Sequence, residues 1–565
     1  MRRALVIAHR ESFLHFEEND IRLLQELGYE VHIAANPANV VNLLEMKGIC
    51  KHEVPFERSP YRKENIVAYR ELCRLMEEYS FQLIHCHTPV GGVLGRMAGH
   101  KYNVTTVYTA HGFHFFKGAP LKNWLLYYPV EKFCSYMTDV LITINKEDYA
   151  LAQKKMYAKS VVYIPGVGVD LNKFSVGISS REQKREELGI PKDAFLLLSV
   201  GELSARKNHQ IVIKALAELK KEDIYYCIAG TGNAREQYQS LIQEGNMEKN
   251  ILLLVNRTDI SELCAASDCF VHPSVREGLG IAPLEGMACG LPLISSCVNG
   301  IKDYTEDGVS GCCVKPLDQE AMKSAIFKMY SDENFRKKCG ENNLKTVQNF
   351  SIEKSAEIMR KLYENIGGGG GIKNLTNMLQ RKMIRKEMGC SEKDILLLSV
   401  GELSKRKNHQ IVIKALAELK KEDIYYCIAG QGAEEEHLKE LIVKNNLQKN
   451  VKLLGFRSDI SELLKAADFF ILPSLQEGLS VALMEAMASG LPVVCSQIRG
   501  NVDLIDERGG RCFDPYSTED CREAIESLLE KDLKEFGNHN AERIKEFGIE
   551  NVGKEMRRIY EMLRF

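Results

Sequence analysis

Short apolar runs alternate with amphipathic segments along the first 165 residues. The runs are mostly apolar, and they lie at 4–8, 31–35, 81–86, 104–110 and 140–144. Between them, apolar residues recur at helical spacing in stretches such as 16–28, 63–79 and 121–137. Continuous apolar strands that alternate with helices are typical of a parallel sheet covered on both faces. We therefore predict a doubly wound α/β domain over residues 1–165, the front domain.

The same pattern starts again after a segment that breaks regular structure. Pro165, Gly166 and Gly168 interrupt residues 163–174, which we interpret as a hinge. A second α/β domain is expected over 166–366. Its strands are predicted at 195–200, 224–230, 250–254 and 269–273, with a closing helix near 350–364.

This second domain is present twice. Residues 196–230 return as 396–430 with one change in 35 positions, where Ala205 is replaced by Lys405. The similarity continues more loosely, and nothing before residue 160 is repeated. The chain is therefore predicted to carry one front domain and two Rossmann-like back domains, the first back domain at 166–366 and the second back domain at 372–565.

Five consecutive glycines, 367–371, separate the two back domains. A run of glycine predicts a flexible linker. The run also aligns with the hinge at 163–174, so it is alternatively a degenerate copy of that hinge. We favour a linker over an ordered turn in either case.

Composition narrows the class of protein. The 565 residues include 75 Lys and Arg against 77 Asp and Glu, so the whole chain offers no electrostatic case for nucleic acid. The apolar run at the N-terminus is too short for a signal peptide, and no run reaches the ~20 residues of a membrane span. The 17 cysteines are scattered and lack the paired spacing of a zinc site. We expect a cytoplasmic protein with reduced cysteines and no bound metal.

The strongest candidate chemistry is a repeated pair of glutamates. Glu277 and Glu285 follow a strand and a Pro-Ser turn, and Glu477 and Glu485 do the same in the second copy. Eight residues on a helix advance ~12 Å, so the first carboxylate is expected at the helix mouth and the second inside the helix. That separation suits two parts of one extended ligand, with helix N–H groups between them for phosphates. Helix capping is the alternative interpretation.

Basic loops and small-residue turns accompany these glutamates. Arg206 and Lys207 follow Gly201 at a strand end, a position suited to neutralising a diphosphate, and Arg406 and Lys407 repeat this arrangement. Alone, such a pair is usually solvated surface. Turns of the type Ala-Gly-Xaa-Gly allow a ligand to approach the backbone closely, and the first copy supplies Gly230 and Gly232.

The front domain offers a histidine and an aromatic segment. His111 ends an apolar strand and precedes Gly112, and the strand end at His87 leads into Gly91 and Gly92, so both histidines are candidate ligand contacts or structural residues. Residues 112–133 combine Phe, Tyr, Lys and the single tryptophan, Trp124. This composition fits a helix at a membrane interface, and a core helix is the alternative.

Taken together, these motifs carry a family resemblance. EGLGIAPLE and EGLSVALME resemble the donor-site motif of retaining glycosyltransferases of family 4, which have the GT-B fold of two facing Rossmann-like domains. HCHTPVGGVLGR, YTAHGFHFFKGAP and DVLITINKEDYALA are similar to the branch that assembles bacterial capsular polysaccharides and exopolysaccharides. The resemblance covers the front domain once and the back domain twice.

The resemblance implies a role for each candidate residue. Glu277 or Glu477 would hold the transferred sugar, and Glu285 or Glu485 the ribose. His111, Glu277, Lys207 and Arg206 are the expected catalytic residues, with the diphosphate on the two cations. The remaining predicted donor contacts are Gly201, Gly230, Gly232, Gly278 and Leu279, and in the second copy Arg406, Lys407 and Gly455. Gly455 can approach a nucleobase, whereas Val255 stands there in the first copy.

The predicted activity is retaining transfer of a hexose or N-acetylhexosamine from a nucleotide sugar, with UDP as the expected nucleotide. The acceptor implied by the resemblance is a polyprenyl-diphosphate-linked saccharide at the inner face of the cytoplasmic membrane, contacted peripherally. No metal and no cofactor are expected. The alternatives are a non-catalytic or autoregulated nucleotide-sugar-binding protein and a GT-B sugar-nucleotide isomerase. We expect the first back domain to dock on the front domain.

Overall fold

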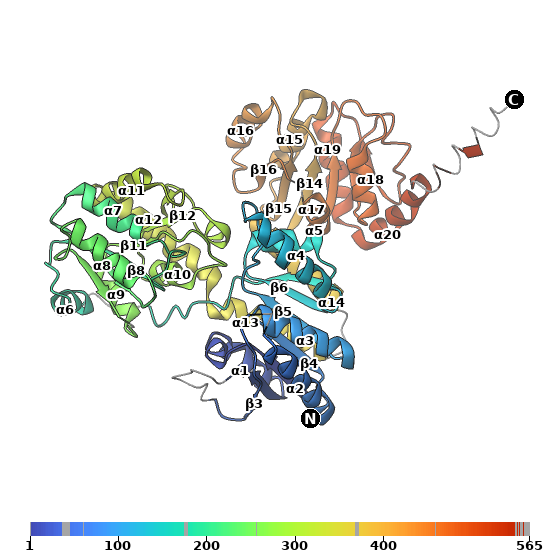
Figure 1. Ribbon diagram of the computed structural model, residues 1–565. Coiled ribbons are helices and arrows are strands. Elements are labelled where there is room, and N and C mark those ends of the chain that lie inside the picture. The colour runs from blue at the N-terminus through green and yellow to red at the C-terminus, as the bar shows by residue number, and fades with distance from the viewer. Residues whose placement is uncertain are drawn as a thin grey trace. The chain divides into compact units, whose positions relative to one another are not determined.

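A computed structural model describes residues 2–36, 46–59, 62–174, 179–255, 257–367, 372–457 and 459–548, with isolated positions between 551 and 558. The chain forms two compact units, 1–376 and 377–565, and each is described by itself (Figure 1). Apart from Gly367, the predicted glycine linker lies outside the described residues.

The front domain is a parallel seven-stranded sheet in the order β3-β2-β1-β4-β5-β6-β7. The strands are β1 Arg2–Ile7, β2 Tyr29–Ala35, β3 Ile49–Glu53, β4 Leu83–His87, β5 Thr105–Ala110, β6 Val140–Thr143 and β7 Ser160–Tyr163. The doubly wound prediction is confirmed. The two edge strands, β3 and β7, were not predicted, because each has a half-buried or exposed face and carries polar residues between its apolar ones.

Helices cover this sheet, and one of them lies unusually close to it. They are η1 Glu11–Glu17, α1 Glu18–Glu26, α2 Glu64–Tyr79, α3 Pro89–Tyr102, α4 Leu121–Ser135 and α5 Lys146–Lys155. A methyl group on Gly92, Gly95 or Gly99 of α3 would come within 2.4 Å of a side chain on β4 or β5. The glycines after His87 therefore serve the packing of α3 on the sheet.

The first back domain is a parallel six-stranded sheet in the order β10-β9-β8-β11-β12-β13. Its strands are β8 Phe195–Val200, β9 Ile224–Ala229, β10 Ile251–Leu254, β11 Cys269–His272, β12 Leu293–Ser296 and β13 Gly311–Val314. Its helices are α6 Ser179–Glu187, α7 Gln210–Leu219, α8 Arg235–Glu244, α9 Ile260–Ala266, α10 Ile281–Ala288, α11 Gln319–Ser331, α12 Glu333–Val347 and α13 Ile352–Gly367.

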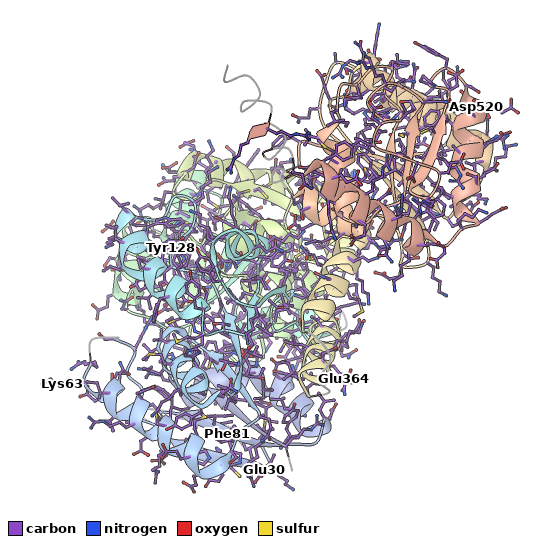
Figure 2. The ribbon with its side chains drawn as sticks, turned by 90° about the vertical axis from the view of Figure 1, so that its right-hand side faces the viewer. Glu30, Lys63, Phe81, Tyr128, Glu364 and Asp520 are labelled. Carbon is purple, nitrogen blue, oxygen red and sulfur yellow. The ribbon has the colours of Figure 1, made fainter. Side chains whose placement is uncertain are left out.

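Helix α13 returns from the first back domain to the front domain, and Figure 2 labels Glu364 near its end. Tyr363 Oη lies 2.8 Å from His85 Nδ1 of β4, and Arg360 pairs with Glu26 of α1. The first unit is thus held together by its hinge and by this crossing helix.

The second back domain repeats the sheet order of the first, as β16-β15-β14-β17-β18-β19. Its strands are β14 Ile395–Val400, β15 Ile424–Ala429, β16 Val451–Gly455, β17 Phe469–Leu472, β18 Val493–Ser496 and β19 Gly510–Phe513. Its helices are α14 Ile372–Glu387, α15 His409–Leu419, α16 Glu435–Lys444, α17 Ile460–Ala466, α18 Val481–Ala488, α19 Thr518–Leu529 and α20 Leu533–Arg543. The duplication predicted from the sequence is confirmed.

Candidate donor site

The basic loop that follows β8 at Gly201 packs closely against the glycine-containing turn that follows β9 at Gly230. Gly201 follows β8 with φ 153°, and its N–H donates to Ala229 O at the end of β9. A methyl group on Gly230 would lie 2.0 Å from Gly201 O, and one on Gly232 would lie 2.2 Å from Leu203 O. Both glycines are therefore needed for the two loops to approach each other.

Glu277 is the centre of an ion-pair cluster. Its Oε1 lies 2.6 Å from Lys207 Nζ and 3.1 Å from Arg206 Nη1, and its side chain is 9% exposed. Ser274 Oγ donates to the same oxygen at 2.9 Å, and His272 Nε2 lies 3.4 Å away. The carboxylate expected to hold the sugar therefore contacts both cations that were expected to hold the diphosphate.

This environment keeps Glu277 ionised. Burial alone would raise the pKa of Glu277, but the hydrogen bond from His272 and the positive charges of Lys207 and Arg206 outweigh burial. The pKa of the carboxyl is held well below its ordinary value. Glu277 is thus a fixed negative charge that accepts hydrogen bonds from hydroxyl groups.

Glu285 lies inside α10 and behaves differently. Burial raises the pKa of its carboxyl to about 7, and Lys173 lowers it only in part. The predicted placement, with one carboxylate at the helix mouth and the other inside, is confirmed. The capping alternative is wrong, because Gly280 is the N-cap of α10 and Ser480 caps α18 with its own side chain.

His111 lies on the side of the front domain that faces the first back domain. Its Nε2 lies 3.2 Å from His87 Nδ1 and 3.4 Å from Glu17 Oε1, and Phe13 packs edge-on against its ring at 4.9 Å. Burial lowers the pKa of His111 to about 4, so the imidazole is neutral near pH 7. Because Nε2 faces inward, a ligand would meet Nδ1 or the edge of the ring.

The first back domain packs directly against the segment of His111. A methyl group on Gly278 would lie 2.1 Å from His111 O, so the glycine after Glu277 is required for the contact. Arg276 donates to Phe113 O, and Lys146 N donates to Asp303 Oδ2 at 2.8 Å. The expectation that the first copy pairs with the front domain is met within this unit.

Leu279 belongs to this contact. Leu279 is 4% exposed and packs on the hinge at Gly166, where a Cβ would lie 2.4 Å from Leu279 Cδ2 and the φ of 75° also favours glycine. The structure therefore brings Gly278 and Leu279 to the seam between two domains of the first unit, beside Glu277.

The second back domain repeats the cluster with changes. Lys407 Nζ lies 2.6 Å from Glu477 Oε1, Arg406 Nη1 lies 3.6 Å from Oε2, and Ser474 Oγ donates to Oε1 at 2.7 Å. Leu472 stands where the first copy has His272. Burial would raise the pKa of Glu477, but the hydrogen bonds and charges of Lys407 and its neighbours lower it.

The outer parts of the second copy are more open. Glu485 is exposed, and Gly455 ends β16 with φ 65° beside Gln431. Leu479, the counterpart of Leu279, is 49% exposed.

Several site residues were missed by sequence reasoning. His272 is the last residue of β11 and Ser274 belongs to the Pro-Ser turn, so strand-end position was the available signal. Glu17 and Arg276 carried no signal, because their partners lie far away in the sequence.

The two Rossmann-like domains of the first unit meet beside this carboxylate–cation cluster and have the GT-B fold of solved glycosyltransferases. The family models agree with this class. The chain belongs to the glycosyl transferases group 1 family, whose model matches residues 180–346 and again 380–549, and a glycosyl transferase 4-like model matches residues 4–145.

Individual relatives support the same class. EpsD of Bacillus subtilis (strain 168), which is assigned as a glycosyltransferase, is 37% identical over 346 residues, covering 60% of this chain and 90% of EpsD. An Escherichia coli UDP-Gal:alpha-D-GlcNAc-diphosphoundecaprenol alpha-1,3-galactosyltransferase is 30% identical, covering 52% of this chain and 77% of its own length. Among solved structures, HepE from Anabaena in complex with UDP and glucose has a TM-score of 0.56 at 19% identity, covering 65% of this chain and all of HepE.

Proposed function

We propose that the first unit is a metal-independent, retaining hexosyl- or N-acetylhexosaminyltransferase that uses a nucleotide sugar, with UDP as the nucleotide. The observation that carries this proposal is the cluster of Glu277, Lys207 and Arg206 directly against the segment of His111. The E. coli relative is named for a UDP-sugar donor, and HepE was solved with UDP.

The cluster supplies the chemistry that such a transfer needs. Arg206 is 46% exposed and, with Lys207, offers positive charge to the diphosphate that leaves with the nucleoside. Two protein cations in this position replace the charge that a divalent ion would otherwise supply. Glu277 accepts hydroxyl hydrogen bonds from the transferred sugar, and Glu285 accepts those of the ribose.

The acceptor proposed for this site is a lipid-linked saccharide of capsule or exopolysaccharide assembly. The E. coli relative is named for a diphosphoundecaprenol-linked acceptor. Among the residues that the structure describes, no helix has the length and apolar content to cross a membrane. A lipid-linked acceptor would therefore be met at the membrane surface.

Helix α4 is the surface proposed for that encounter. Trp124 and Tyr128, the latter labelled in Figure 2, pack on the front-domain core. Elsewhere on α4, Leu121, Leu125 and Phe133 are exposed at 74%, 67% and 66%. Because these exposed apolar side chains are interleaved with lysines, α4 has the composition of an interfacial helix. The core-helix interpretation holds for only some of the residues of α4.

The membrane contact is tested by co-sedimentation with anionic vesicles. Replacing Leu125 and Phe133 by serine should reduce the bound fraction roughly tenfold, since each exposed apolar side chain contributes about 1 kcal/mol or more on insertion. Leu317→Ser is the matched control, because Leu317 is equally exposed on the first back domain. Equal binding of all three proteins would contradict the proposal.

The transfer itself is tested by following UDP release. The full chain is mixed with UDP-sugars and with polyprenyl-diphosphate saccharides, and UDP release that depends on both substrates is expected. Nucleotide binding without release for any pair would favour the alternative of a nucleotide-sugar-binding protein. Interconversion of the sugar nucleotide without an acceptor would favour an isomerase.

A further inference from the structure

Three potential metal ligands lie close together in the front domain: Glu17, His87 and His111. His87 Nδ1 and His111 Nε2 lie 3.2 Å apart, and Glu17 Oε1 lies 3.5 Å from the first and 3.4 Å from the second. The three atoms form a nearly equilateral triangle.

The size of this triangle matches one face of a coordination tetrahedron. Zinc binds imidazole nitrogen and carboxylate oxygen at about 2.0–2.1 Å, so two tetrahedral ligands lie about 3.3–3.4 Å apart. The separations of the three atoms would have to change by only a fraction of an ångström to match that spacing. Two imidazoles and one carboxylate are also a ligand set that Zn²⁺ accepts.

The ligand atoms are buried and incompletely satisfied. Glu17 is 3% exposed and His87 is fully buried. Glu17 Oε1 has no hydrogen-bond partner of acceptable geometry among the described residues. A buried carboxylate oxygen without a partner is costly, and a cation held between it and two imidazoles would remove that cost.

The fold holds the three ligands from separate elements. Glu17 is the last residue of η1, His87 is the last residue of β4, and His111 follows β5. His87 and His111 are therefore carried by adjacent strand ends, and Phe13 packs against both rings. The side chain of His111 is 22% exposed, which gives an ion a path from solvent.

A second three-ligand group in the front domain is less suitable. Glu30, His32 and Cys50 also lie within reach of one ion. However, Glu30 Oε1 lies 3.7 Å from His32 Nε2, farther than any two ligand atoms of the first group, and Glu30 Oε2 is held by Arg3 at 2.7 Å. Glu30 and Cys50 are also only half-buried, so solvent can satisfy them without an ion.

We propose that Glu17, His87 and His111 form a binding site for one divalent transition-metal ion, with Zn²⁺ the best match. The ion lies on the inner side of His111 and fixes the orientation of that ring. It is separate from the charge that Arg206 and Lys207 offer to a diphosphate. The site does not depend on the proposed function. Sequence spacing did not indicate it, because the ligands come from three distant segments.

The affinity should be moderate. Metal-bound histidines usually donate their second ring N–H to a partner, which strengthens the site. His87 Nε2 is buried without such a partner in the described part of the chain. We therefore expect micromolar binding, weaker than that of a structural zinc site.

The proposal is tested with the chelator-treated full chain. Zn²⁺ binding is measured by equilibrium dialysis with metal analysis, and Co²⁺ is used as a spectroscopic probe. One ion per chain with the visible absorption of tetrahedral Co²⁺ is expected. Two variants each remove one ligand: Glu17→Gln, and His111→Ala at the partly exposed position. Each should weaken Zn²⁺ binding by about tenfold to a hundredfold or more, since losing even a supporting partner of a ligand has an effect of that size. Glu30→Gln is the control for the other group and should bind as the wild type does.

Circular dichroism and thermal melting show whether each variant is folded. If Glu17→Gln does not fold, His111→Ala still tests the proposal. Unchanged binding in both variants would overturn the proposal. Cobalt–thiolate charge-transfer absorption would assign the ion to some of the 17 cysteines and would overturn it as well. Loss of binding in Glu30→Gln alone would move the site to Glu30.

Discussion

The first and second back domains share a fold and an ion-pair cluster, but they differ in what covers the donor face. Gly278 lies against His111 O and Leu279 is 4% exposed, whereas a methyl group on Gly478 would meet nothing within 4 Å and Leu479 is 49% exposed. The Glu-Gly-Leu sequence is shared, but Val275, Arg276 and Gly280 stand where the second copy has Leu475, Gln476 and Ser480. Burial of the shared glycine and leucine in the first unit therefore comes from the front domain and the hinge, and Arg276 adds a contact that Gln476 does not match in sequence.

The same comparison separates the two kinds of glutamate. Glu277 and Glu477 are both 9% exposed and both paired with a lysine at 2.6 Å, so their environment is built within the back domain. Glu285 is half-buried and Glu485 is exposed. The environment of the first glutamate of each pair is built within its own back domain, whereas the exposure of the second glutamate differs between the two copies.

The largest effect is expected for the first glutamates. Glu277→Gln removes the charge that holds Lys207 and Arg206 and that accepts sugar hydroxyls, so transfer should fall about 10²–10³-fold. Glu477→Gln should reduce transfer far less and should instead lower nucleotide binding to the second copy. Steady-state UDP release and binding stoichiometry measure the two effects. Equal losses of transfer in both variants would contradict the assignment of catalysis to the first copy.

A second effect concerns the domain contact. Leu279→Asp places an unpaired carboxylate in a buried position and should destabilise the first unit by about 2–4 kcal/mol. Leu479→Asp changes an exposed residue and should stay within about 0.5 kcal/mol of the wild type. Urea unfolding of the two variants gives the comparison. A large loss from Leu479→Asp would show that this face of the second copy is covered.

The smallest effect is a pH dependence. The pKa of Glu285 is raised to about 7 by burial, so the carboxylate that we propose accepts ribose hydroxyls forms only as pH rises through that value. UDP affinity of the first copy should therefore increase by up to about tenfold between about pH 6 and about pH 8.

The sign for stability is the opposite. The folded-state pKa is raised from 4.5 to about 7, so the stability that the protonated Glu285 contributes is fully present below the lower value and is lost as pH rises through about 7. Glu285→Gln should remove both dependences, which calorimetric titration between about pH 6 and about pH 8 and thermal melting between about pH 4 and about pH 8 would show. Persistence of the binding step in Glu285→Gln would assign it to another group.

Much of the fold could be predicted from hydrophobic pattern. Strands buried on both faces over most of their length, such as β1 and β8, have mostly apolar sequences. The edge strands β3 and β7 were not predicted, because only part of each strand meets the core. The duplication was visible because it is written directly in the sequence.

The candidate site was predictable where its residues lie close together along the chain. The loop position of Glu277 and the helical position of Glu285 followed from strand ends and spacing. The contact of Lys207 with Glu277 and the grouping of Glu17 with His87 and His111 could not be predicted. These contacts join segments that come together only when the parallel strands align.

The interlocked loops at Gly201 and Gly230 also bear on how the gene acquired its repeat. The segment that is nearly identical in the two copies runs from β8 through α7 to β9 and ends at this glycine, and its counterpart ends at Gly430 against Gly401 O. Its tightest steric fit is therefore internal to the exchanged piece. A recombination that moves this segment as one block carries both glycine positions together. A domain whose flanking sequence differs can therefore receive the segment without compensating substitutions at this contact.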